Sequence, residues 1–192
     1  MIAIIKYNAG NVKSVENAIL RLGYDCIITD KESEILRAEK IIFPGVGEAS
    51  SAMKYLKEKK LDQIIPVLQQ PVLGICLGLQ LMCNYSEEAN TIGLGIFDTT
   101  VKKFPPKEIV PHMGWNNSSQ LKGELFRDIN SDADFFYVHS YYAELCDETI
   151  GICDYILPFS AALQKNNFYA VQFHPEKSAL IGSQLLKNFI SL

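Results

Sequence analysis

Short apolar runs alternate with stretches of helical periodicity in the first half of the chain. Continuous runs predict strands buried on both faces at 2–5, 40–43 and 72–75, and a further strand is expected at 24–29. Between these runs apolar residues recur every three or four positions, which predicts helices at 12–22, 49–56, 61–68 and from 77 to about 85. Because strands that alternate with helices form parallel sheets covered on both faces, this half predicts an α/β architecture.

The pattern changes after Gly93. Short segments rich in β-branched and aromatic residues follow, and they predict mainly antiparallel strands at 99–104, 135–138, 152–157, 161–164 and 169–173. A last amphipathic helix is expected at 179–190. No linker or repeat interrupts the chain, and its length suits one domain. We therefore expect a single α/β domain over 1–192, with a central, mostly parallel sheet flanked by helices and an antiparallel, β-rich second half.

Composition excludes several classes of function. Lys and Arg number 18 against 22 Asp and Glu, without a basic stripe, so the sequence argues against nucleic-acid binding. The apolar N-terminal run is too short for a signal segment or a membrane span. The five cysteines include no C-x-x-C pair. The sequence therefore predicts neither a disulfide framework nor a metal site, and a cytoplasmic setting is expected.

Candidate chemistry begins at Cys76, in the run Gly74-Ile75-Cys76-Leu77-Gly78. A G-x-C-x-G run between a buried strand and a helix is typical of a nucleophile elbow, in which a sharp turn projects the central side chain. The helix N-terminus beside it favours the reactive thiolate. Taken alone, the run also fits a small buried cysteine with no chemical role.

A cysteine nucleophile needs a base, and His174 is the candidate. It follows the expected strand at 169–173, and Glu176 stands two positions further on. Since alternate residues of an extended segment point the same way, Glu176 is expected to hold one imidazole nitrogen while the other faces the thiol. Pro175 keeps His174 extended. Without the elbow, His-Pro-Glu would also fit an ordinary loop.

Backbone donors for a developing oxyanion are expected in Pro44-Gly45-Val46-Gly47, which follows the strand at 40–43. The carboxyl ends of parallel strands share one rim of the sheet, which would bring this segment beside Cys76. The Leu77 N–H is a second candidate donor. The same G-x-G is half of a dinucleotide-binding fingerprint, but Ser50 stands where the third glycine belongs, and this weakens nucleotide binding as an alternative.

Together these motifs resemble the class I, triad-type glutamine amidotransferases over the whole chain. The resemblance rests on P-G-V-G, G-I-C-L-G-L-Q-L and F-H-P-E-K-S, in this order and in their structural contexts. The stretches P-H-M-G-W-N at 111–116 and Y-V-H-S-Y at 137–141, with Lys177, also resemble the glutaminase subunit of imidazole glycerol phosphate synthase.

The resemblance implies a role for each matching residue. Cys76 matches the nucleophile, His174 the general base and later acid, and Glu176 the carboxylate that orients the base. The backbone oxyanion positions are matched by Gly47 and Leu77, with Val46 on the strand whose peptide rotates before the hole forms. The positions that contact glutamine are matched by Gly45, Gln80, His139, Ser140 and Tyr141. The positions that face a partner are matched by Asn11, Trp115, Asn116, Tyr137 and Lys177, whereas His112 and His139 are expected to be structural or interface residues rather than bases.

The implied activity is hydrolysis of glutamine to glutamate and ammonia without a cofactor. The implied partner is a (β/α)₈-barrel synthase subunit that uses the ammonia on the ribulosyl nucleotide PRFAR to make imidazole glycerol phosphate and AICAR. Two alternatives stay open: a glutaminase that serves a pyridoxal phosphate or anthranilate synthase, and a catalytically silent binding subunit. The chain departs from the family in its first loop, where Lys6-Tyr7-Asn8 replaces the usual Asp-Tyr-Gly, and the expected effect is on coupling to the partner rather than on chemistry.

Overall fold

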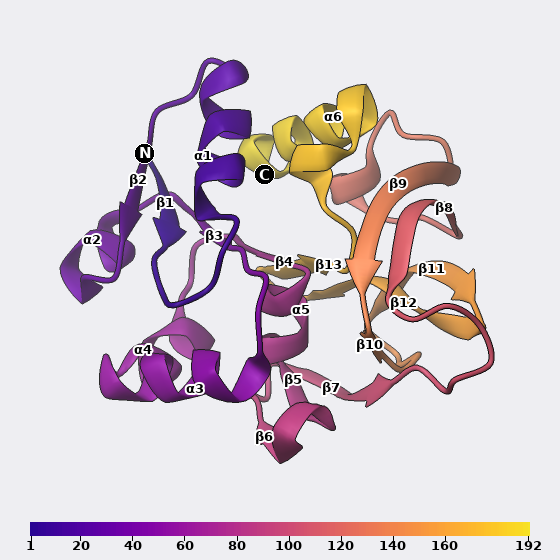
Figure 1. The fold of residues 1–192 in the computed structure, drawn as a ribbon. Coiled ribbons are helices and arrows are strands. Elements are labelled where there is room, and N and C mark those ends of the chain that lie inside the picture. The colour runs from indigo at the N-terminus through magenta and orange to yellow at the C-terminus, as the bar shows by residue number, and fades with distance from the viewer.

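The main sheet of the computed structural model, which describes residues 1–192, has nine strands. They are β1 (Ile2–Ile5), β2 (Cys26–Thr29), β3 (Lys40–Phe43), β4 (Val72–Ile75), β8 (His112–Ser119), β9 (Asp132–His139), β11 (Thr149–Tyr155), β12 (Leu157–Lys165) and β13 (Phe168–Val171). Their order in the sheet is β2-β1-β3-β4-β13-β12-β11-β8-β9. The strands from β2 to β13 pair in parallel, and those from β13 to β9 pair antiparallel. The expected division into a parallel and an antiparallel half is confirmed (Figure 1).

Helices cover both faces of the parallel half. The α-helices are α1 (Val12–Arg21), α2 (Glu32–Arg37), α3 (Ala49–Glu58), α4 (Leu61–Ile64), α5 (Leu77–Met82) and α6 (Ala179–Ser191), and the 3₁₀ helices are η1 (Ile65–Val67), η2 (Glu88–Asn90), η3 (Glu124–Phe126) and η4 (Pro175–Lys177). In Figure 1, α1 and α6 lie on one side of the sheet and α3 and α4 on the other. Alternate residues of β1 belong to the two cores, Ile2 and Ile4 to the core of α1 and α6, and Ala3 and Ile5 to that of α3, α4 and α5. Burial on both faces explains the continuous apolar runs.

A smaller sheet lies beside α5. Its strands are β5 (Cys83–Ser86), β6 (Thr91–Ile92), β7 (Phe97–Lys103) and β10 (Tyr141–Ala143), in the order β10-β7-β5-β6. The predicted helix from 77 to about 85 is therefore too long, because α5 ends at Met82. The carbonyls of Leu81, Met82 and Cys83 accept hydrogen bonds from the N–H groups of 94, 96 and 95, so a neighbouring segment takes the place of a further helical turn.

Other boundaries differ from the prediction for local reasons. The helix expected at 61–68 divides into α4 and η1, where Pro66 lacks the N–H that an α-helix needs. The short helix α2 and the strand β8 were not predicted. The last predicted strand, β13, is antiparallel to β12 but parallel to β4, and so joins the two halves of the sheet. No helix of the structure combines the length and the apolar character that a membrane crossing requires.

Candidate active site

Cys76 occupies the predicted sharp turn between β4 and α5. Its φ of 53° and ψ of −105° lie outside the usual regions for a residue with a side chain. A Cβ at Gly78 would lie 1.9 Å from the carbonyl oxygen of Phe43, and one at Gly74 would lie 2.8 Å from the sulfur of Met82. Gly78 therefore lets α5 pack closely against β3, Gly74 lets it pack closely against β4, and this packing supports the strained turn.

His174 and Glu176 form a buried pair at the end of β13. The imidazole Nδ1 donates to Glu176 Oε1 over 2.7 Å, and neither side chain is exposed to solvent. Pro175 and the extended backbone of His174 agree with the prediction, but Glu176 lies in the 3₁₀ helix η4 rather than in an extended segment. The predicted contact is therefore made by a different backbone conformation.

The electrostatics of the pair depend on Cys76. Burial alone would lower the pKa of His174, but the neighbouring Cys76 sulfur and the Glu176 carboxylate raise it to about 10. Burial would raise the pKa of Glu176, yet hydrogen bonds from His174 and Asn11 keep that pKa below its ordinary value. The His174 Nε2 atom is buried without a partner of good hydrogen-bond geometry. The arrangement suits an imidazole that exchanges a proton with the adjacent thiol.

Asn11 contributes to this pair in a way that the sequence did not predict. Its Nδ2 donates to Glu176 Oε1 over 2.5 Å. Asn11 precedes α1, with a left-handed φ of 75°, and its side chain makes no capping hydrogen bond to that helix. The side chain is therefore used for a long-range contact. The only sequence signal was a turn-forming asparagine after a glycine, which does not specify a partner.

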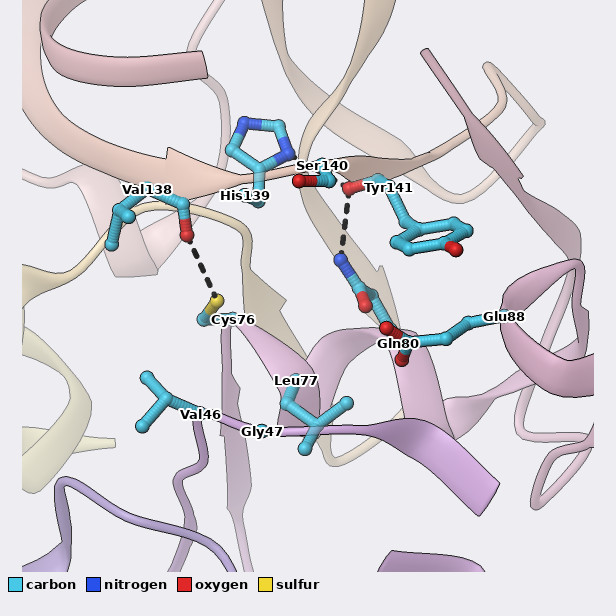
Figure 2. A pocket seen from close by; sticks show the side chains of 10 residues that line it. All are labelled: Val46, Gly47, Cys76, Leu77, Gln80, Glu88, Val138, His139, Ser140 and Tyr141. Carbon is cyan, nitrogen blue, oxygen red and sulfur yellow. Dashed lines mark hydrogen bonds between the residues drawn. The ribbon is translucent and has the colours of Figure 1, made fainter. Parts of the chain in front are cut away.

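A cavity of about 170 Å³ opens next to the Cys76 thiol (Figure 2). It is lined by Val46, Gly47, Cys76, Leu77, Gln80, Glu88, Val138, His139, Ser140 and Tyr141. The predicted glutamine-contacting residues are therefore brought together, except for Gly45, which does not line the cavity. Glu88, from η2, was not predicted and adds a carboxylate to the wall.

The predicted oxyanion segment lies beside the elbow, as expected, but one of the two candidate donors, the Leu77 N–H, is already used. The Leu77 N–H donates to the Gly45 carbonyl over 3.2 Å, and the Gly10 N–H donates to the Val46 carbonyl over 3.0 Å. The Tyr7 hydroxyl packs against Gly45, where a Cβ would lie 1.9 Å from it. In this state the Leu77 N–H does not point to an empty oxyanion site.

The hydrogen bonds around the sulfur involve two glutamine side chains. Gln80 Nε2 donates to the Tyr141 carbonyl over 2.9 Å and to Gln172 Oε1 over 3.0 Å. Gln172 Nε2 lies 3.5 Å from Cys76 Sγ, and the Val138 carbonyl lies 3.9 Å from it. Gln172 was not among the predicted site residues, because a glutamine next to a buried strand carries no distinctive sequence signal.

The residues that were predicted to face a partner do not all reach the surface. Trp115 is 54% exposed, and Lys177 lies over the ring of Phe136 with its Nζ 5.8 Å from the ring centre. Tyr137, by contrast, is fully buried. Its assignment to a partner surface is therefore wrong. Residues of a strand alternate between faces, and it is the neighbouring Phe136 that lies with Trp115 and Lys177.

His112 and His139 form a buried pair, of which His139 also lines the cavity. His139 Nδ1 lies 2.8 Å from the Tyr141 carbonyl, His139 Nε2 lies 3.0 Å from His112 Nδ1, and Asn116 Nδ2 lies 3.1 Å from His112 Nε2. Burial lowers the pKa of His112 to about 4 and that of His139 to about 3. Both rings are therefore neutral at ordinary pH, and the two ring nitrogens of His139 are already paired with His112 and with the Tyr141 carbonyl.

No group of three or more His, Cys, Asp or Glu side chains is arranged to hold a metal ion. All five cysteines are free thiols.

Comparison with known proteins identifies the family. The family model for glutamine amidotransferase class-I matches residues 3–192. The chain belongs to the class-I glutamine amidotransferases. It is 55% identical to a protein of Bacteroides fragilis (strain YCH46) named imidazole glycerol phosphate synthase subunit HisH, with 100% of this chain and 99% of that protein covered. The protein of the same name from Pectobacterium atrosepticum is 45% identical, with the same coverage.

Solved structures agree on the fold. A crystal structure of a glutamine amidotransferase has a TM-score of 0.76 at 15% identity and covers 100% of this chain and 98% of that one. A glutamine amidotransferase from Thermotoga maritima has a TM-score of 0.67 at 17% identity and covers 99% of this chain and 80% of that one. The resemblance inferred from the sequence motifs is thus confirmed at the level of the family and the fold.

Proposed function

We propose that this chain hydrolyses glutamine and supplies the ammonia to the synthase that makes imidazole glycerol phosphate in histidine biosynthesis. The observation that carries the proposal is the meeting of a strained-turn thiol with a buried imidazole–carboxylate pair, at the edge of a cavity in a class-I amidotransferase fold. Relatives of similar length that carry the synthase-subunit name support the choice of acceptor. In this proposal the whole chain, 1–192, acts as one amidotransferase domain.

The first half of the reaction forms a thioester. The Cys76 proton passes to His174 Nε2, and the raised pKa of His174 favours this transfer. The sulfur then attacks the side-chain amide carbon of glutamine, and a C–S bond forms as the carbonyl π electrons move to oxygen. When the oxyanion collapses, the C–N bond breaks and His174 protonates the departing nitrogen, which leaves as ammonia. Glu176 holds the imidazole in position throughout.

The second half releases glutamate. His174 takes a proton from water, the resulting hydroxyl attacks the thioester carbon, and the C–S bond breaks to restore the Cys76 sulfur. Donors for the oxyanion must come from the backbone near Val46, Gly47 and Leu77, and the Leu77 N–H is bonded to the Gly45 carbonyl in this structure. Rotation of the Gly45–Val46 peptide would release that N–H, so we propose that the chain alone is a slow glutaminase.

The proposed partner is a (β/α)₈-barrel synthase subunit that binds the acceptor PRFAR. Trp115, Asn116 and Lys177, together with Phe136, are the proposed contact residues on this chain. Ammonia has to pass directly between the subunits, because in water it would be protonated and lost as a nucleophile. We propose that the reaction takes place in the cytoplasm, where a reducing environment keeps thiols free, in agreement with the five unpaired cysteines.

The test is to separate the use of glutamine from the use of ammonia. The chain and the barrel subunit are mixed with PRFAR, and imidazole glycerol phosphate is measured with glutamine or with an ammonium salt as the nitrogen source. Cys76→Ala is expected to abolish the glutamine-dependent product and to leave the ammonium-dependent product intact. Glutamine-dependent product from the variant would refute the proposal, and stimulation by an anthranilate or pyridoxal phosphate synthase instead would reassign the acceptor.

A further inference from the structure

The carbonyl oxygen of Tyr141 receives two hydrogen bonds, and these determine the orientation of its neighbours. Gln80 Nε2 lies 2.9 Å from it and His139 Nδ1 lies 2.8 Å from it (Figure 2). A carbonyl oxygen accepts hydrogen bonds and never donates them. Gln80 must therefore present its NH₂ group to Tyr141, and His139 must carry its proton on Nδ1.

The orientation of Gln80 in turn sets that of Gln172. The second N–H of the Gln80 amide points at Gln172 Oε1, 3.0 Å away. Gln172 therefore presents its own NH₂ group to Cys76 Sγ, at 3.5 Å. If the Gln172 amide were flipped, its NH₂ group would face the NH₂ group of Gln80. Gln172 is fully buried, so no water could accept the hydrogen bond that would be lost between them.

The buried His112–His139 pair supports the assignment of the His139 proton to Nδ1. With its proton on Nδ1, His139 accepts at Nε2 from His112 Nδ1, and His112 then accepts at Nε2 from Asn116 Nδ2. Because the row ends on a carbonyl oxygen that can only accept, and each neutral imidazole carries one proton, the row has only one consistent direction. The Tyr141 carbonyl is thus held in place from both sides.

We propose that Gln172 is a further catalytic residue, whose amide donates a hydrogen bond to the Cys76 sulfur and stabilises its thiolate form. The proposal rests on the proposed role of Cys76 as nucleophile. A hydrogen bond to an ionised acceptor is stronger than one to a neutral group, so the contact favours the thiolate over the thiol. The same contact favours the thiolate as leaving group when water hydrolyses the thioester.

The position of Gln172 separates its effect from substrate binding. Gln172 does not line the cavity, which is bounded on that side by Cys76 and Gln80. Both N–H groups of Gln80 are already used, so Gln80 meets a bound glutamine only through its Oε1 acceptor. Loss of the Gln172 donor is therefore expected to lower kcat for glutamine hydrolysis and to leave KM for glutamine nearly unchanged.

Two variants and one control test this assignment in the full chain. Gln172→Glu keeps an oxygen for the Gln80 amide but replaces the donor to sulfur with a second acceptor. Gln172→Met removes both contacts with little change in side-chain volume. It is the second variant in case the buried carboxylate of Gln172→Glu prevents folding. Gln69→Glu makes the same chemical change at an exposed glutamine that precedes β4, at the opposite end of that strand from Cys76, and whose amide donates to the Val67 carbonyl.

The readout is the pH dependence of Cys76 alkylation by iodoacetamide, with each cysteine peptide followed separately by mass spectrometry. The pH of half-maximal alkylation rate is expected to rise by about one unit in Gln172→Met and by more in Gln172→Glu, where a like charge faces the sulfur. The Gln69→Glu profile is expected to match the wild type. In the complex with the barrel subunit, both Gln172 variants are expected to lose kcat rather than raise KM.

The outcomes distinguish this inference from the proposed function. Unchanged alkylation profiles in folded Gln172 variants, with glutamine use still dependent on Cys76, would overturn the assignment of Gln172 and leave the proposed function standing. Glutamine-dependent product from Cys76→Ala would overturn both. A raised KM with an unchanged kcat would show that Gln172 acts on substrate binding, contrary to the assignment.

Discussion

Asn11 and Glu176 are 165 positions apart in the chain, yet the Asn11 amide donates a 2.5 Å hydrogen bond to the Glu176 carboxylate. The same carboxylate oxygen accepts the Nδ1 proton of His174. The neighbouring Gly10 bonds to Val46 in the candidate oxyanion segment. One short loop thus contacts both the base side and the oxyanion side of the site, and this loop contains the departure from the family pattern at Lys6 and Asn8.

Replacement of Asn11 by glycine is expected to slow catalysis without weakening glutamine binding. Glycine tolerates the left-handed φ of Asn11, so the substitution removes the side chain and keeps the backbone. A hydrogen bond to a charged group contributes about 1.5–3 kcal/mol, so kcat is expected to fall by roughly tenfold or more when Glu176 loses this donor. Steady-state kinetics of the complex give kcat and KM separately.

Asn8→Gly is the matched control, since Asn8 lies in the same loop, is exposed and contacts only the Ser51 carbonyl. It is expected to keep the wild-type kcat. If Asn11→Gly instead weakened association with the barrel subunit and left kcat unchanged at saturating partner, Asn11 would act as a partner contact, as the resemblance implied, and not on Glu176.

The buried histidine pair predicts a loss of stability in acid. The pKa of His112 is about 4 and that of His139 about 3, whereas an unfolded histidine titrates near 6.5. Below about pH 6.5 the unfolded chain therefore binds more protons than the folded chain, and the free energy of unfolding falls as pH falls. The slope is up to about 1.4 kcal/mol per pH unit for each histidine, until the folded pKa is reached.

Urea unfolding at several pH values between 7 and 4.5 measures this slope. His112→Phe keeps an aromatic ring in the stack with Tyr137 and Tyr155, and removes one titrating group. Its free energy of unfolding is expected to fall less steeply below pH 6.5 than that of the wild type. Parallel curves for the two proteins would show that His112 is not held neutral by the fold.

The close packing of α5 against β3 predicts that Gly78→Ala is destabilising. The added Cβ would lie 1.9 Å from the Phe43 carbonyl oxygen, so α5 or the strand must move. Such overpacking typically costs about 1–3 kcal/mol. Gly23→Ala is a control with a left-handed φ of 84° and no atom within 4 Å of the new Cβ, and it is expected to cost less. Urea unfolding compares the two, and an equal or smaller loss for Gly78→Ala would contradict the prediction.

Trp115 is expected to be central to partner binding. Large aromatic residues carry a disproportionate share of interface energy, and Trp115 lies on the surface with its ring against Phe136. Trp115→Ala is expected to raise the Kd for the barrel subunit by roughly tenfold or more. Ile92→Ala removes another exposed apolar side chain, from β6 in the smaller sheet, and is expected to leave Kd unchanged. Titration calorimetry measures both, and similar Kd values for the two variants would refute the assignment.

The strands buried on both faces were predicted most accurately. β1, β3 and β4 begin and end at the predicted residues, because a run that is apolar throughout suits only the centre of a covered parallel sheet. The end of α5 was missed because its last carbonyls bond to residues 94–96, and this contact is invisible in the local pattern.

The site shows the same division between local and long-range information. The turn at Cys76 and the pairing of His174 with Glu176 follow from residues that are adjacent or nearly so in sequence. The contacts of Asn11 and Gln172 join segments far apart in the chain, and their side chains have no special pattern. Tyr137 was placed on the wrong face of β9 because a shift of one position reverses every side chain of a strand.

The place of β13 between β4 and β12 has a consequence for the newly made chain. The strand that leads to Cys76 is among the first to be synthesised, but the strand beside it, which leads to His174, is the last. Until β13 inserts, β4 has an open edge and the thiol has no proton acceptor. Hydrolysis of glutamine by the proposed triad therefore requires a chain that extends at least through Glu176 and in which β13 has taken its place beside β4.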